Sequence, residues 1–130
     1  MVMEQVRGSK TYKLPLYEIQ KLAPDISWST PPTITSDLSP VEVCHLIGEW
    51  YTANSNEAHR HAAGQFFTPP PVARYMANIA GTLHTDMRVL DPGAGTGILA
   101  CAICEMAILQ QIPALSIEAF ESDSVLNTLW

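Results

Sequence analysis

Apolar residues recur at helical spacing in the middle of the chain. Four of them fall at positions i, i+3, i+4 and i+7 just after a run of three prolines, which places them on one face of a helix. We expect Thr68 to cap the start of this helix and Gly81 to end it, with the prolines in its first turn. The stripe is expected to pack in the core, and its members are Val72, Tyr75, Met76 and Ile79.

A second helix is predicted over residues 40–52. Ser39 and Glu42 have the spacing of a capping box, and Pro40 suits the first helical position. Residues 14–22 are expected to form a short helix. Residues 23–38, which are rich in Pro, Ser and Thr, are expected to form an extended arm with turns. The apolar face of the second helix comprises Val43, Leu46, Ile47 and Trp50.

The last third of the chain predicts a strand, a helix and a strand. Residues 89–91 form a short apolar run, residues 98–111 an apolar helix, and residues 115–120 another strand. This order predicts an α/β fold, the opening β-α-β of a doubly wound parallel sheet, preceded by a helical N-terminal segment. We expect a lead over residues 1–58 and a partial domain over residues 59–130. Two strands leave a sheet edge unpaired, which a homodimer or a partner segment would cover.

Glycines at alternate positions separate the first strand from its helix. Gly93, Gly95 and Gly97 carry no Cβ, so a ligand can rest directly on the main chain, and they permit positive φ where the chain reverses. The unpaired N–H groups and positive dipole end of the following helix favour an anionic group there. The spacing G-x-G-x-G differs from the G-x-G-x-x-G of dinucleotide folds, so pyrophosphate is the less favoured ligand.

An acidic residue follows the second predicted strand. Nucleoside-binding α/β folds commonly place a carboxylate about 20 residues beyond the glycines, where it accepts hydrogen bonds from ribose hydroxyls. Glu121 is the candidate ribose ligand, and Asp123 and Glu118 are the alternatives.

Two sequence stretches resemble those of a known family. The string Asp91-Pro92-Gly93-Ala94-Gly95-Thr96-Gly97 resembles the first motif of S-adenosylmethionine-dependent methyltransferases that methylate amino groups. Together with Gly64-Gln65-Phe66-Phe67-Thr68-Pro69 upstream, it is similar to the adenine-specific DNA methyltransferases of restriction–modification systems. The similarity covers roughly residues 60–130.

The resemblance implies a Rossmann-like class I methyltransferase sheet with S-adenosylmethionine as cofactor. The methionine end of the cofactor would lie on the glycine turn, and Phe120 or Ile117 could flank its adenine ring. One of the two adjacent phenylalanines is expected to plug the core beneath the loop. The implied cofactor-binding residues are Phe66, Phe67, Thr68, Asp91, Pro92, Gly93, Gly95, Gly97 and Glu121.

The catalytic motif of the resembled family does not occur in the sequence. Those enzymes use Asn/Asp-Pro-Pro-aromatic to accept the amine of a flipped adenine and to stack on its ring, and no such tetrapeptide is present. We therefore expect the cofactor-binding portion of an adenine methyltransferase that ends before the catalytic residues and is inactive alone. Two alternatives stay open: a non-catalytic interaction module, and a methyltransferase acting on RNA or on a protein amide.

The net charge and the composition restrict the kinds of partner that we expect this chain to contact. The formal net charge of −6 has the wrong sign for neutralising phosphates, so DNA would be contacted only through missing or partner segments, such as a complementing catalytic half. No apolar run approaches the ~18 residues of a membrane span, and no secretion signal is evident; we expect a cytoplasmic location and no membrane contact.

The cysteines and histidines are expected to have structural or surface roles. Cys101 and Cys104 form C-x-x-C inside an apolar helical stretch, and no histidine pair offers the spacing of a metal site. We expect these two and Cys44 to be buried structural cysteines, and His59 and His61 to lie on the surface. No metal site is predicted.

Overall fold

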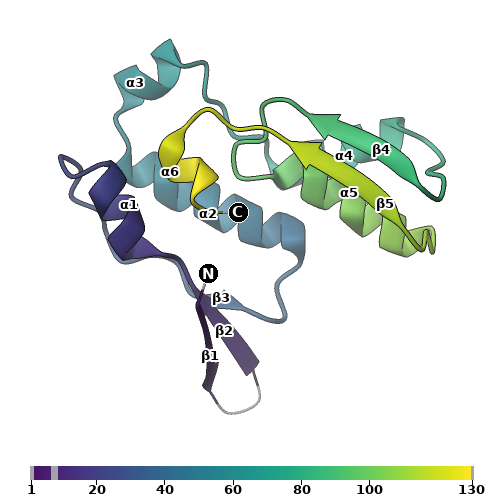
Figure 1. Cartoon of the computed structure of the whole chain (residues 1–130), viewed down its shortest axis with the longest axis horizontal. Helices are drawn as coiled ribbons and strands as arrows, with labels where there is room; N and C mark the ends of the chain where they lie inside the picture. Colours follow the sequence, from purple (N-terminus) through teal and green to yellow (C-terminus); the bar gives the residue numbers. More distant parts are fainter. Residues whose placement is uncertain (1, 7–8, 130) are drawn as a thin grey trace.

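A small antiparallel sheet opens the computed structural model, which describes residues 2–6 and 9–129. Strands β1 (Val2–Val6) and β2 (Ser9–Lys13) form a hairpin, and β3 (Ile34–Thr35) pairs with β2. The hairpin projects from one end of the molecule (Figure 1). The sequence predicted helices and an extended arm in this N-terminal lead but no sheet, so the expectation of a helical N-terminal segment was incomplete. Polar residues interrupt any apolar alternation in these strands, and β3 lies about 20 residues downstream, so no local pattern indicates the sheet.

The N-terminal helices largely follow the sequence pattern. Helix α1 (Leu16–Leu22) matches the short predicted helix, and α2 (Pro40–Asn54) extends slightly beyond its predicted end. The capping box is present: Ser39 Oγ accepts from the Glu42 N–H at 3.3 Å, and the Glu42 carboxylate accepts from the Ser39 N–H at 2.8 Å. A third helix, α3 (Glu57–Ala62), was not predicted; the Asn56 side chain caps it.

The β-α-β unit occupies the C-terminal half. Strands β4 (Met87–Asp91) and β5 (Leu115–Ala119) pair in parallel, and α5 (Ile98–Leu109) connects them and contacts both. A short helix, α6 (Ser124–Asn127), follows. Asp91 pairs in register with Ala119, so both strands end at the same edge of the sheet. Helix α5 ends earlier than predicted because Gln111 adopts a positive φ of 57°.

Helix α4 (Pro70–Ile79) forms where expected but buries the opposite face. Ala73 and Ala77 are 0% and 4% exposed and pack toward α5 and α2, because small side chains let helix backbones approach closely. The predicted core stripe was wrong: its four residues are 45–66% exposed. Thr68 was also wrong as the cap, since Pro69 occupies that position without a side-chain hydrogen bond. Gly81, with φ of 77°, follows the end of the helix as expected.

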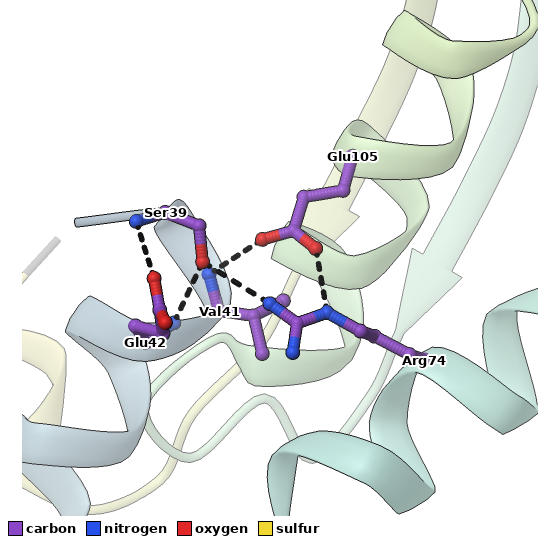
Figure 2. Close-up of polar contacts among 5 residues, drawn as sticks. All are labelled: Ser39, Val41, Glu42, Arg74 and Glu105. Carbon is purple, nitrogen blue, oxygen red and sulfur yellow. Dashed lines mark hydrogen bonds and ion pairs between the residues drawn. The ribbon is translucent and has the colours of Figure 1, made fainter. Parts of the chain in front are cut away.

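A polar cluster joins α2, α4 and α5 (Figure 2). Arg74 on α4 donates from Nε to Glu105 on α5 at 2.9 Å and from Nη2 to Ser39 Oγ at 3.1 Å. The other Glu105 oxygen accepts from the Val41 N–H at 3.1 Å. Partial burial raises the pKa of Glu105, but the bonds from Arg74 and Val41 outweigh it and leave the pKa below its usual value. The cluster fixes the start of α2 against the other two helices.

Helix α2 contributes to both apolar cores. The first core uses the N-terminal half of the helix and the second its C-terminal half, so α2 connects the N-terminal segment to the β-α-β unit. The first core contains Val41, Cys44, Ala73, Ala77, Leu83, Ile98, Ala102, Met106 and Ala107. The second contains Leu14, Ile19, Trp28, Ile47, Trp50, Tyr51, Val125 and Leu126.

Candidate functional site

The glycine turn closes tightly between β4 and α5. Gly95 and Gly97 have φ of 56° and 82°, in the left-handed region that only glycine adopts without strain. Gly93 has an ordinary φ, and a Cβ built there would meet no atom within 4 Å. The Ala94 N–H donates to the Phe120 carbonyl at 2.9 Å, which holds the turn against the end of β5. The turn thus presents bare backbone to open space at the strand tips.

Glu121 lies directly on this turn. Its Oε2 accepts from the Gly95 N–H at 2.7 Å, and its Oε1 accepts from the Asp123 N–H at 2.7 Å. The alternatives lie elsewhere: Glu118 pairs with Arg88 on the exposed surface of the sheet, and Asp123 caps α6. Because the Glu121 carboxylate contacts the turn, no space is left between them. A ligand must therefore rest on the surface that the carboxylate and the turn form together.

A cavity of about 170 Å³ opens beside the Glu121 carboxylate. Five of the nine predicted site residues line it, namely Phe66, Phe67, Gly93, Gly95 and Glu121. Thr68 lines a different cavity, on the α2 side of Phe67. The remaining three, Asp91, Pro92 and Gly97, belong to the same turn but do not line the cavity.

The two phenylalanines of the loop differ in their surroundings. The Phe67 ring packs edge-on against Tyr51, with centroids 5.7 Å apart, and against Gly48, where a Cβ would come within 3.3 Å of the ring. Phe66 is 74% exposed, and its ring lies 5.6 Å from that of His61. Phe67 therefore plugs the core, whereas Phe66 lies at the mouth of the cavity.

A hydrogen-bond network around the Tyr51 hydroxyl supports the loop that carries Phe66 and Phe67. The sequence did not indicate this network. Tyr51 Oη donates to Asp123 Oδ2 at 2.8 Å, and Gln65 Nε2 donates to the same oxygen at 3.1 Å. Burial and the Asp123 charge raise the pKa of Tyr51. Burial raises the pKa of Asp123, but bonds from the α6 N–H groups, Tyr51 and Gln65 leave it lowered. No sequence spacing connects these residues, since they come from α2, the loop and the α6 cap.

Asp91 holds an unpaired oxygen beneath the turn. The residue is 8% exposed, and its Oδ1 accepts from the Gly93 N–H at 3.4 Å. Its Oδ2 is buried and has no hydrogen-bond partner within the described part of the chain. A buried carboxylate oxygen without a donor is unfavourable, so a cationic or N–H-bearing ligand group would stabilise it.

Within residues 2–6 and 9–129, no group of three or more His, Cys, Asp or Glu side chains is arranged to hold a metal ion. No helix in the same ranges has the length and apolar character needed to cross a membrane.

The fold and the site define a class of domain, and a family model gives the family. A parallel β-α-β unit whose glycine turn meets an acid at the tip of the next strand is the arrangement of Rossmann-like α/β domains that bind nucleoside cofactors. The family model described as N-6 DNA Methylase matches residues 43–127, so the chain belongs to the N-6 DNA methylase family, which uses S-adenosylmethionine. The match begins within α2, upstream of the motifs that carried the resemblance. No curated protein and no solved structure gives a significant match.

Proposed function

We propose that this chain is the cofactor-binding portion of an adenine-specific DNA methyltransferase and binds S-adenosylmethionine in the cavity beside Glu121. The contact of the Glu121 carboxylate with the Gly95 N–H is the observation that carries the proposal. It joins the glycine turn and the acid of the next strand into one polar surface. We further propose that residues 59–130 form this partial domain and residues 1–58 a lead.

The donor and acceptor groups at the cavity suit such a cofactor. A carboxylate offers about four lone-pair positions. The Gly95 N–H uses one on Oε2, and the Asp123 N–H and the more distant Ser122 hydroxyl, at 3.5 Å, lie on Oε1, which leaves Oε2 an acceptor position for a ribose hydroxyl. Gly93 leaves space above the turn, since a Cβ built there would meet no atom within 4 Å. The bound cofactor supplies the activated methyl group.

Methyl transfer needs groups that these 130 residues lack. The Asn/Asp-Pro-Pro-aromatic tetrapeptide is absent from the sequence, and the net charge is −6. We therefore propose that DNA is held by other segments, that the chain by itself transfers no methyl group, and that it acts in the cytoplasm without membrane contact. Incubation with labelled cofactor and adenine-containing DNA tests this, and specific incorporation of label would overturn it.

A non-catalytic interaction module is the second candidate. It is favoured by the exposed apolar stripe of α4 and by the outer edges of β4 and β5, which have no strand partner among the described residues. Either a complementing catalytic half or a second copy of the chain would cover these surfaces. Light scattering and calorimetric titration of the purified chain distinguish the two candidate functions. A chain that self-associates and does not bind the cofactor would support the interaction module.

Family membership favours DNA as the methylated substrate over RNA or a protein amide.

Calorimetric titration with S-adenosylhomocysteine tests the site. We expect binding by the parent chain and a loss of about 10- to 100-fold in affinity for Glu121→Gln, since one charged acceptor is removed. Glu118→Gln is the matched control: it changes an acid of β5 that faces Arg88 instead of the turn. No binding by the parent, or an equal loss in both variants, would contradict the proposed site.

A further inference from the structure

Two cysteines from different helices meet in the first apolar core. The Cys44 S–H, on α2, donates to the Cys101 sulfur, on α5, and the two sulfur atoms are 3.4 Å apart. The C-x-x-C spacing in the sequence points instead to Cys101 and Cys104. Those two lie three residues apart on one helix, where Cβ atoms are about 5–6 Å apart, beyond the ~3.5–4.5 Å of a disulfide. The tertiary structure therefore selects a pair that sequence spacing does not.

We propose that Cys44 and Cys101 are a thiol pair that a hydroperoxide converts reversibly into a disulfide. A cavity of about 390 Å³ reaches the Cys44 side of the pair, since Cys44 lines it together with Thr96 and Ile98 at the start of α5. Cys101 is partly exposed and Cys44 is buried. The S–S bond would need the sulfur atoms to approach from 3.4 Å to about 2.05 Å, a movement within the reach of side-chain rotation.

The surroundings of the two cysteines determine which thiol reacts first with the peroxide. Cys101 lies in the first turn of α5, where the helix dipole favours a thiolate. The hydrogen bond from Cys44 lowers the pKa of Cys101, although burial and the Glu105 charge oppose it, and the same bond and burial raise the pKa of Cys44. Cys101 is therefore the thiolate that reacts first.

The reaction balances with one peroxide per disulfide. The Cys101 thiolate attacks a peroxide oxygen, the O–O bond breaks, and with one proton taken up a sulfenic acid and one water form. The Cys44 sulfur then attacks the sulfenic sulfur as its proton leaves; the S–S bond forms, the S–O bond breaks, and the departing hydroxide takes up the proton as water. Two thiols are oxidised and hydrogen peroxide is reduced to two waters. A small dithiol reverses the change by thiol–disulfide exchange.

Peptide mapping of the intact chain after treatment with hydrogen peroxide tests the proposal. Trypsin releases Cys44 on residues 22–60, and Cys101 and Cys104 together on residues 89–130. We expect these two peptides to be linked, with the chain lighter by two hydrogen atoms and still monomeric. The link should also form in Cys104→Ser, the matched control, and disappear in Cys101→Ser. A link within residues 89–130, a link that is lost in Cys104→Ser, or dimers alone would overturn the proposal.

Two further readouts test the pair, one on the parent chain and one on Cys44→Ser. Oxidation of the parent chain should raise the midpoint of thermal unfolding by about 5–15 °C, because the bond closes a long loop, and dithiothreitol should reverse the rise. In Cys44→Ser, dimedone should label Cys101, since no resolving thiol remains. An unchanged midpoint despite a mapped link, or labelling only at Cys104, would count against the pair. Neither outcome depends on cofactor binding.

Discussion

The Tyr51 hydroxyl donates a 2.8 Å hydrogen bond to Asp123 across 72 residues of sequence. This bond connects the last turn of α2 to the cap of α6, and Gln65 adds the loop that carries Phe66 and Phe67. Asp123 also donates its N–H to Glu121. The position of Glu121 and the position of the loop over the turn therefore both depend on Asp123, the first through its backbone N–H and the second through its carboxylate.

Replacing Tyr51 by phenylalanine should loosen this loop. The variant keeps the ring that packs against Phe67 but loses the hydroxyl, which should lower the free energy of unfolding by about 1 kcal/mol. It should also speed amide hydrogen exchange at residues 64–68. Tyr75→Phe is the control, since Tyr75 is 66% exposed on α4. Equal exchange in both variants would show that the network does not hold the loop.

Filling the space above Gly93 should block the cofactor without straining the turn. Gly93→Val adds a side chain where no atom lies within 4 Å of the Cβ, so we expect near-parental stability and loss of S-adenosylhomocysteine binding. Gly95→Val should also abolish binding, but a valine at φ of 56° is strained. Gly81→Ala is the control for backbone strain alone, because Gly81 has a φ of 77° and is far from the cavity in sequence. Cys104→Ala should bind S-adenosylhomocysteine almost as the parent chain does. Parental affinity in Gly93→Val would refute the cavity assignment.

Substitutions on the two faces of α4 should differ in how much they lower the stability of the chain. Ala77→Leu adds volume at a position that is 4% exposed and should destabilise the chain by about 1–3 kcal/mol through overpacking. Ile79→Ala removes a side chain that is 66% exposed and should cost about 0.5 kcal/mol or less. Chemical unfolding measures both. A larger loss for Ile79→Ala would indicate that the stripe is buried, for example by a second copy.

Stability should fall with acid partly through Glu105. Its pKa is lower in the folded chain than its ordinary value of 4.5, so its contribution is complete above that pH and is lost as the pH falls through the lower folded value. Glu105→Gln should therefore differ from the parent above pH 4.5 and converge with it in stronger acid. The difference should be at most about 1 kcal/mol, since Arg74 is 43% exposed and solvent screens the pair. A difference that grows toward acid would contradict this sign.

The local elements whose signals are contiguous follow from the order of the amino acids alone. The capping box at Ser39 fixed the start of α2, and the apolar runs on each side of the glycines determined β4, α5 and β5, because dihedral preference and apolar periodicity are local properties. The family followed from the same stretch. These features place the glycine turn and Glu121 at neighbouring strand tips.

Which helix faces and which distant groups meet depends on long-range packing. Helix α4 carries apolar residues on two faces, and close packing on α5 selected Ala73 and Ala77 rather than the larger stripe. The contacts of Tyr51 with Asp123 and of Cys44 with Cys101 join residues more than 50 positions apart. Such pairs depend on how helices cross, and a short-range pattern of apolar and polar residues carries no information about that crossing.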